Sequence, residues 1–136
     1  MRVTRKYENI CVAHRLPKHT GKCKRMHGHN YDLTVSVSGP VSDEGVVLWY
    51  EQVDEAVMPW VDGVDHFTVL GESDPWLLAL VDLMGDNVVR MPGGMDPTVE
   101  NLAAWALADI NARLPDGYRV ARLDMTETSR SSVSLP

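Results

Sequence analysis

The stretch Cys23-Lys24-Arg25-Met26-His27-Gly28-His29-Asn30-Tyr31 carries two histidines in a strand-like pattern. Residues two apart on an extended strand project from the same face, so His27 and His29 point to one side. The same parity continues along an apolar stripe, which places both imidazoles at the edge of a core: Tyr31, Leu33, Val35 and Val37. A single His-x-His pair is also compatible with two half-exposed strand residues, so a metal site needs a second observation.

A second alternating stripe supplies that observation upstream of the pair. Ile10 and Val12 are followed at the same parity by His14. If the two strand ends meet, three imidazoles converge and leave the fourth position of a tetrahedral zinc ion open to water or substrate. The pattern therefore predicts a catalytic type of Zn²⁺ site formed by His14, His27 and His29. In the alternative, Cys23 is a fourth ligand that closes the site and makes it structural.

Length and composition limit the class of protein. The 136 residues, 44% of them hydrophobic, predict a single domain over residues 1–136 with one core. No apolar run reaches the roughly 18 residues of a membrane span, and the first residues lack the apolar stretch of a secretory signal. We therefore expect a cytoplasmic protein with no membrane partner. In that setting Cys11 and Cys23 are expected to be thiols rather than a disulfide.

Positive charge gathers around Cys23 although the net charge is −6. Eight of the thirteen Lys and Arg residues lie within the first 25, and the remainder has five arginines against eighteen carboxylates. This distribution argues against a nucleic-acid partner, but a basic patch beside a metal site suits an anionic small molecule. A purely solvated loop is the alternative. The residues around the thiol are Arg15, Lys18, Lys22, Lys24 and Arg25.

The remaining chain alternates between strand and helix patterns. Alternating apolar residues predict strands over residues 2–14, 31–38, 87–91 and 118–128. Apolar stripes at helical spacing predict three helices: one from about residue 50 that Pro59 limits, one over 76–84, and one that begins after Pro97-Thr98. Residues 129–136 are expected to be loose. The pattern is that of an α+β domain with antiparallel strands in two hairpins and helices packed on one face.

Five motifs, in chain order, resemble those of the 6-pyruvoyltetrahydropterin synthase and 6-carboxytetrahydropterin synthase family. They are Ala13-His14-Arg15-Leu16, Cys23-x-x-x-His27-Gly28-His29-Asn30-Tyr31, Asp65-His66, Pro97-Thr98-x-Glu100-Asn101 and Thr126-Glu127-Thr128. The three-residue spacer before His27 resembles the carboxy branch. The sequence departs from the family at Trp49, where an acidic or amide residue is usual. An acidic or amide side chain can cap a helix, whereas tryptophan cannot. The helix over 76–84 looks like an addition to the compact family pattern.

The resemblance implies a fold and an activity. The fold is the tunnelling fold, a four-stranded antiparallel sheet with helices on one face, whose subunits form a homo-hexamer of two stacked trimers. The activity is that of a zinc-dependent carbon-carbon lyase that converts 7,8-dihydroneopterin triphosphate to 6-carboxy-5,6,7,8-tetrahydropterin, with release of acetaldehyde and triphosphate, for queuosine or another 7-deazapurine. One alternative is a 6-pyruvoyltetrahydropterin synthase, which only eliminates triphosphate. Another is a noncatalytic, zinc-stabilised binding module.

Within that activity, further residues receive roles. Cys23 is the expected base, because nearby cations and zinc favour its thiolate. Asp65 and His66 suit a proton relay, and Glu127, which ends the apolar stripe of the last strand, can accept hydrogen bonds from a pterin ring. Lys22, Lys24 and Arg25 are expected to bind the triphosphate. The alternatives are a surface turn for Asp65-His66 and a surface glutamate for Glu127. Glu100 is expected to stabilise a helix N-terminus.

Overall fold

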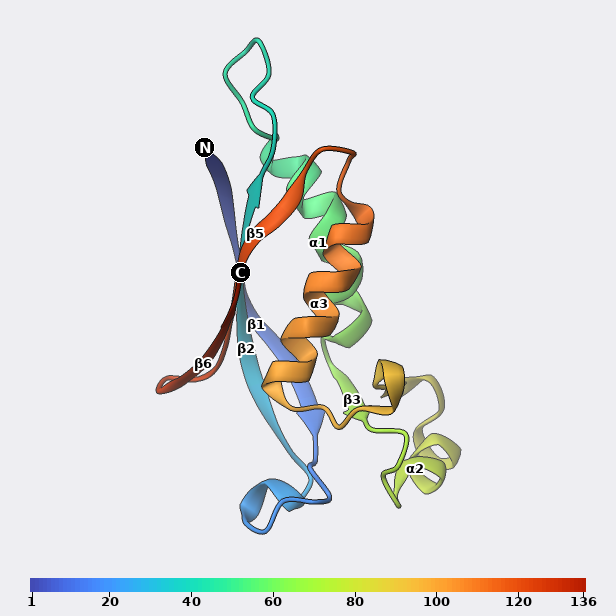
Figure 1. Ribbon diagram of the computed structural model, residues 1–136. Coiled ribbons are helices and arrows are strands. Elements are labelled where there is room, and N and C mark those ends of the chain that lie inside the picture. The colour runs from blue at the N-terminus through green and yellow to red at the C-terminus, as the bar shows by residue number, and fades with distance from the viewer.

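A six-stranded mixed sheet forms one layer of the computed structural model, which describes residues 1–136 (Figure 1). The strand order is β4-β3-β1-β2-β5-β6. β1 pairs antiparallel with β2, β2 with β5 and β5 with β6, whereas β3 runs parallel to both β1 and β4. The strands are β1 (Arg2–His14), β2 (His27–Ser38), β3 (Phe67–Leu70), β4 (Val88–Arg90), β5 (Arg119–Thr128) and β6 (Ser131–Leu135).

Two of the three helices cover one face of this sheet. α1 (Tyr50–Val64) and α3 (Val99–Arg113) lie side by side against it, and the shorter α2 (Leu77–Met84) lies beyond the end of β3 (Figure 1). The core between these layers contains the predicted strand stripe Leu33, Val35 and Val37, all completely buried. None of the helices combines the length and apolar character that crossing a membrane requires.

The α+β class is confirmed, but the expected four-stranded antiparallel sheet is wrong in number and direction. β3 follows α1 in the chain and runs parallel to β1. β4 in turn runs parallel to β3. The expectation of a loose tail is also wrong. Residues 131–135 fold back as β6 on β5, where Val133 and Leu135 pack against the core.

Pro59 does not limit the first helix, which continues through it to Val64. A proline removes the hydrogen bond to the carbonyl of the residue four positions earlier, here Glu55. Both residues are exposed, so the Glu55 carbonyl can bind water instead. At the start of the same helix, the Trp49 side chain provides no cap, but the Trp49 N–H donates to Gln52 Oε1 at 3.1 Å. This contact ties Gln52 to the residue before the helix but leaves the first-turn N–H groups without the side-chain acceptor that an acidic or amide residue at position 49 would supply.

A β-bulge in β1 places His14 on the core side of the sheet. The pairing of β1 with β2 shifts register between Tyr7 and Ile10, and Asn9 has a positive φ of 59°. Asparagine tolerates this left-handed conformation better than most residues, and a bulge exchanges the faces of the residues that follow it. Before the bulge the odd-numbered residues face inward; after it Ile10, Val12 and His14 do so.

Candidate metal centre and active site

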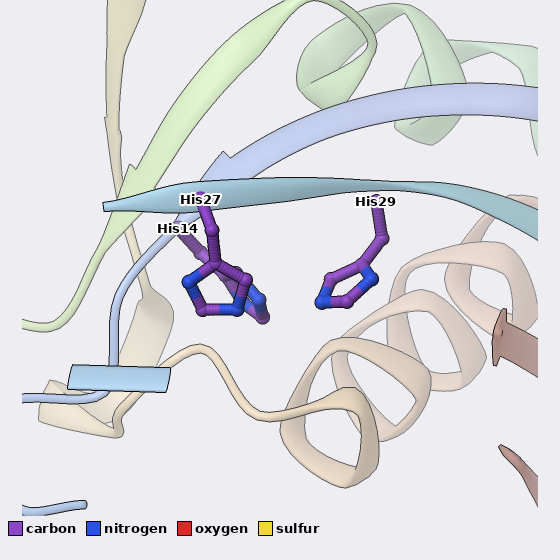
Figure 2. Close-up of side chains that lie close together, drawn as sticks. All are labelled: His14, His27 and His29. Atoms are coloured by element: carbon purple, nitrogen blue, oxygen red, sulfur yellow. The ribbon is translucent and has the colours of Figure 1, made fainter. Parts of the chain in front are cut away.

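Three imidazoles meet where β1 ends and β2 begins. Strand pairing places His14 opposite His27 and Val12 opposite His29, so all three histidines lie on the helix-covered face. One ring nitrogen from each lies within 4.8 Å of the others. Figure 2 shows the three rings turned into a common space beneath the strands. His14 is fully buried, and His27 and His29 are half-buried. The predicted convergence of these histidines is confirmed.

Backbone carbonyls fix the tautomers of two of these histidines. Pro97 O lies 2.7 Å from His14 Nδ1, and Arg25 O lies 2.7 Å from His27 Nδ1. A carbonyl can only accept, so each Nδ1 carries the proton and each Nε2 keeps a free lone pair. Both Nε2 atoms are buried and have no partner in the chain. Unpaired buried polar atoms are costly, and this orientation of histidine by a second contact is typical of metal ligands.

The electrostatic setting keeps His14 neutral. Burial lowers the pKa of His14, and the neighbouring His27 and His29 act in the same direction, against the opposing effect of the Pro97 carbonyl. A neutral imidazole is the form that binds a metal. Three imidazoles suit zinc, which is commonly held by nitrogen ligands with one position left open. The residues therefore fit the predicted ion.

The Cys23 thiol shares a pocket of about 220 Å³ with His14, His27 and Glu127. Cys23 lies in the short 3₁₀ turn Lys22–Lys24, and its carbonyl accepts from Leu16 N–H at 2.9 Å. The set of ligand atoms within 4.8 Å contains the three imidazoles but not the thiol. This arrangement favours an open metal site with Cys23 beside it over a closed four-ligand site.

Glu127 reaches the same pocket from the end of β5. Tyr31 Oη donates to Glu127 Oε1 at 3.1 Å, and His29 Nε2 lies 3.8 Å from the same oxygen. Burial of Tyr31, together with the nearby Glu127 carboxylate, raises the pKa of the phenol. Tyr31 therefore remains a donor that orients the carboxylate. The apolar stripe predicted Tyr31 only as a core residue, although its parity with His29 places it on the same face.

His66 lines a different pocket, which neither Cys23 nor Glu127 lines, and Asp65 contacts His66 beside it. That pocket, of about 280 Å³, is lined by His66, Cys11 and Asn30. His66 Nδ1 lies 3.0 Å from Asp65 Oδ1, and Cys11 N–H donates to the same oxygen at 2.7 Å. Burial alone would raise the pKa of Asp65, but these two contacts outweigh it and the pKa is lowered. The structure of one chain does not bring this pair to the Cys23 thiol.

The basic residues separate into an exposed group and one buried arginine. Lys18, Lys22, Lys24 and Arg25 are exposed, and Lys18 Nζ lies 3.2 Å from Asp96 Oδ2. We call these four residues the basic loop. Arg15 does not belong to it, because its side chain is buried. The expectation that Arg15 contributes to an anion patch is therefore wrong.

Buried contacts of Arg15 connect the thiol loop to the segment before α2. Arg15 Nη1 donates to Asp74 Oδ1, and Arg15 Nε donates to Lys24 O, both at 3.2 Å. Its guanidinium carbon lies 3.7 Å from the centroid of the Trp76 ring. Sequence spacing alone gave no sign of this contact, because Arg15 and Asp74 lie 59 residues apart.

Comparisons with known proteins agree with this fold and site. A family model described as 6-pyruvoyl tetrahydropterin synthase matches residues 2–136. A probable 6-carboxy-5,6,7,8-tetrahydropterin synthase from Halobacterium salinarum is 33% identical over 120 residues, which cover 88% of this chain and 76% of that protein. The 6-carboxy-5,6,7,8-tetrahydropterin synthase of Rickettsia felis is 26% identical, with 99% of each chain covered.

Solved structures confirm the fold. An uncharacterized protein from Wolinella succinogenes has a TM-score of 0.83 at 17% identity, covering 99% of this chain and 97% of that one. The Caenorhabditis elegans 6-pyruvoyl tetrahydropterin synthase has a TM-score of 0.72 at 21% identity, covering 99% and 95%. Fold and histidine cluster thus define an α+β protein of the tunnelling-fold class. The chain belongs to the 6-pyruvoyl tetrahydropterin synthase family.

Proposed function

We propose that this protein is a zinc-dependent 6-carboxy-5,6,7,8-tetrahydropterin synthase. It converts 7,8-dihydroneopterin triphosphate and one water to 6-carboxy-5,6,7,8-tetrahydropterin, acetaldehyde and triphosphate. The observation that carries the proposal is the pair of buried, unpartnered Nε2 atoms on His14 and His27, directed into a space beside a thiol. The names of the relatives from Halobacterium and Rickettsia support the same activity. We place the enzyme in the cytoplasm, where its product feeds the synthesis of queuosine or another 7-deazapurine.

His14, His27 and His29 are the proposed zinc ligands, since their ring nitrogens lie within 4.8 Å of one another. Zinc bound there supplies a Lewis acid that polarises a substrate hydroxyl or carbonyl oxygen and acidifies the adjacent carbon. The Cys23 thiolate removes the proton from that carbon.

Glu127 holds the pterin ring in this proposal. A carboxylate can accept two hydrogen bonds from the amino-pyrimidinone edge of a pterin. The hydrogen bond from Tyr31 Oη to Glu127 Oε1 orients the carboxylate within the pocket that Cys23 also lines. The ring is thereby fixed at one end and its side chain reaches the histidines and the thiol.

Asp65 and His66 are the proposed proton relay, and they require a second subunit. Within one chain the pocket that His66 lines is not the pocket that Cys23 lines, and a neighbouring chain is the proposed source of the pair at the thiol. We propose a homo-hexamer of two stacked trimers. The sheet ends on both sides in a short strand, β4 and β6, and open edges of this kind can pair between subunits.

The runner-up is a 6-pyruvoyltetrahydropterin synthase, which eliminates triphosphate without cleaving the side chain. The solved structures of that name share so little sequence identity with this chain that the similarity supports only the fold. The three-residue spacer between Cys23 and His27 and the names of the curated relatives favour the carboxy product.

Product identification tests the proposal. The purified, zinc-loaded protein is incubated with 7,8-dihydroneopterin triphosphate, and pterins and aldehydes are identified by mass spectrometry. We expect 6-carboxy-5,6,7,8-tetrahydropterin and acetaldehyde in equal amounts. A 6-pyruvoyl product without acetaldehyde would contradict the carboxy assignment. A zinc-loaded, folded protein that leaves the substrate intact would favour a noncatalytic binding module.

A further inference from the structure

A second cluster of potential metal ligands lies outside the Cys23 pocket. Cys11 Sγ, a carboxylate oxygen of Asp65 and a ring nitrogen of His66 lie within 4.8 Å of one another. Side chains alternate along β1, so Cys11 projects from the face opposite Val12, away from the three-histidine cluster. The proposed proton relay accounts for Asp65 and His66 but gives the Cys11 thiol no role.

Strand pairing forces these three residues together. The parallel pairing of β1 with β3 places Val12 beside Phe67, so the residue before each, Cys11 and His66, are also neighbours. Cys11 N–H donates to Asp65 Oδ1 at 2.7 Å, and His66 N–H donates to Cys11 O at 2.6 Å. The backbone of Cys11 therefore holds both other members of the cluster.

The conformation of His66 supports a functional arrangement. His66 has a φ of +64°, a left-handed conformation that few residues other than glycine adopt. Its imidazole lies against the preceding carboxylate, with Nδ1 3.0 Å from Asp65 Oδ1. Unusual backbone conformations of this kind gather at ligand and active sites, where the surrounding structure enforces them.

Asn30 supplies a further oxygen at the same place. It is the β2 partner of Cys11, and Asn30 Oδ1 lies 3.2 Å from Cys11 Sγ. The pocket of about 280 Å³ lined by Cys11, Asn30 and His66 gives an ion access from solvent. The donors available are one sulfur, one nitrogen and oxygens from a carboxylate and an amide.

We propose that Cys11, Asp65 and His66 form a second metal site, which binds a divalent cation of the zinc type. A thiolate and a carboxylate contribute two negative charges and neutralise a divalent ion. Thiolate and imidazole favour Zn²⁺ or Co²⁺ over Mg²⁺ and Ca²⁺, which prefer oxygen. The site differs from the three-histidine cluster in having a sulfur ligand and in the high exposure of His66, 76%, so its ion exchanges more readily.

Occupation of this site has a consequence for the reaction, which rests on the proposed function. An ion bound to Asp65 and His66 withdraws the proton relay, because a metal-bound imidazole nitrogen cannot exchange a proton. Excess zinc is therefore an inhibitor that acts through Cys11.

Cobalt spectroscopy tests the site without reference to activity. The metal-free protein is titrated with Co²⁺, and the absorption of the thiolate-to-cobalt charge-transfer band is recorded. We expect two cobalt ions per chain and a charge-transfer band that grows with the second. Cys11→Ser should lose this band and one ion, while Cys23→Ser, the matched control, keeps both. Retention of the first, three-histidine cobalt spectrum in Cys11→Ser shows that the variant is folded.

Three results would overturn the proposal. They are a single cobalt per chain without a charge-transfer band, a band that survives in Cys11→Ser, and a band that disappears in Cys23→Ser instead. A separate assay applies to inhibition: excess zinc should slow turnover of the wild type at least tenfold and leave Cys11→Ser unaffected. Equal inhibition of both proteins would refute the regulatory part. Failure of the proposed reaction would leave the cobalt result unchanged, so the two claims are tested independently.

Discussion

Arg15 Nη1 donates a hydrogen bond to Asp74 Oδ1 over 3.2 Å, and both side chains are almost completely buried. The pair connects two segments that are 59 residues apart. Arg15 also donates to Lys24 O, one residue after the proposed base Cys23. The segment that leads into α2 therefore supports the thiol loop.

Removing Arg15 should destabilise the protein strongly. Arg15→Met keeps much of the side-chain volume but leaves Asp74 as an unpaired buried charge, which typically costs about 3–5 kcal/mol. Urea unfolding of the zinc-free protein measures the change in the free energy of unfolding. The matched control is Arg113→Met, which breaks an exposed ion pair with Asp109 within α3 and should have little effect. An equal decrease in the free energy of unfolding in the two variants would show that the buried Arg15–Asp74 pair contributes no more than an exposed pair.

Acid should weaken the tie between α1 and β1. Asp54 accepts from Arg5 Nη2 at 2.6 Å and from Tyr7 Oη at 2.7 Å, and the hydrogen bond from Arg5 is the main cause of the lowered pKa of Asp54. A carboxyl group with a lowered native pKa binds protons more readily when unfolded. Its contribution is thus present above the unfolded pKa of about 3.9 and is lost as pH falls through the native value.

Unfolding free energies between about pH 6 and about pH 3 measure this contribution. Asp54→Asn should give a lower stability at the upper end and a flatter dependence on pH. Asp62→Asn, on the exposed side of the same helix, serves as the control and should keep the wild-type slope. Parallel curves for the wild type and Asp54→Asn would rule out Asp54 as a source of the acid sensitivity.

Alternating apolar patterns predicted strands at β1, β2, β4 and β5 but not at β3, and they predicted the meeting of three histidines because burial on one face dictates such patterns directly. The same reasoning could not place Asp65 and His66, since their position depends on a parallel pairing of β3 with β1 and on the positive φ of His66. It also missed β6, whose alternation of serine with Val133 and Leu135 is short and weakly apolar. Pro59 was misread because its effect depends on the exposure of the Glu55 carbonyl, which sequence spacing does not reveal.

Glu127→Gln should weaken pterin binding. The substitution keeps the side-chain volume but places an amide donor against donors of the pterin ring, and an unpaired buried group typically costs about 1–3 kcal/mol, roughly a five- to 150-fold change in Kd. Equilibrium binding of the substrate at unchanged zinc content measures the effect. Tyr31→Phe, which removes only the donor to Glu127 Oε1, should weaken binding less. An unaltered Kd in Glu127→Gln would remove Glu127 from the binding site.

Reversing charge in the basic loop should raise KM for the triphosphate substrate. Lys22→Glu combined with Lys24→Glu places repulsion where attraction for the triphosphate is proposed, and added salt should raise the wild-type KM in the same sense because exposed charges are screened. The control pair Arg113→Glu and Arg119→Glu lies at the C-terminal end of α3 and the start of β5. It should leave KM unchanged.

A neutral pterin substrate separates binding of the triphosphate from effects on the thiol. Sepiapterin, if it is accepted, lacks the phosphates and should be turned over equally by the wild type and the Lys22→Glu, Lys24→Glu protein. Equal impairment with both substrates would mean that the loop acts on Cys23 or on folding instead.

The central claim is that three imidazoles hold zinc while Cys23 stands beside it as a reactant. The zinc content of purified variants, measured after competition with a saturating chelator that contains no thiol, tests this arrangement directly. In His27→Ala the strong zinc of the three-histidine site should be lost. In Cys23→Ala that zinc should remain at about one ion per chain while turnover falls by at least a hundredfold. Loss of this zinc in Cys23→Ala, or its retention in His27→Ala, would contradict the account.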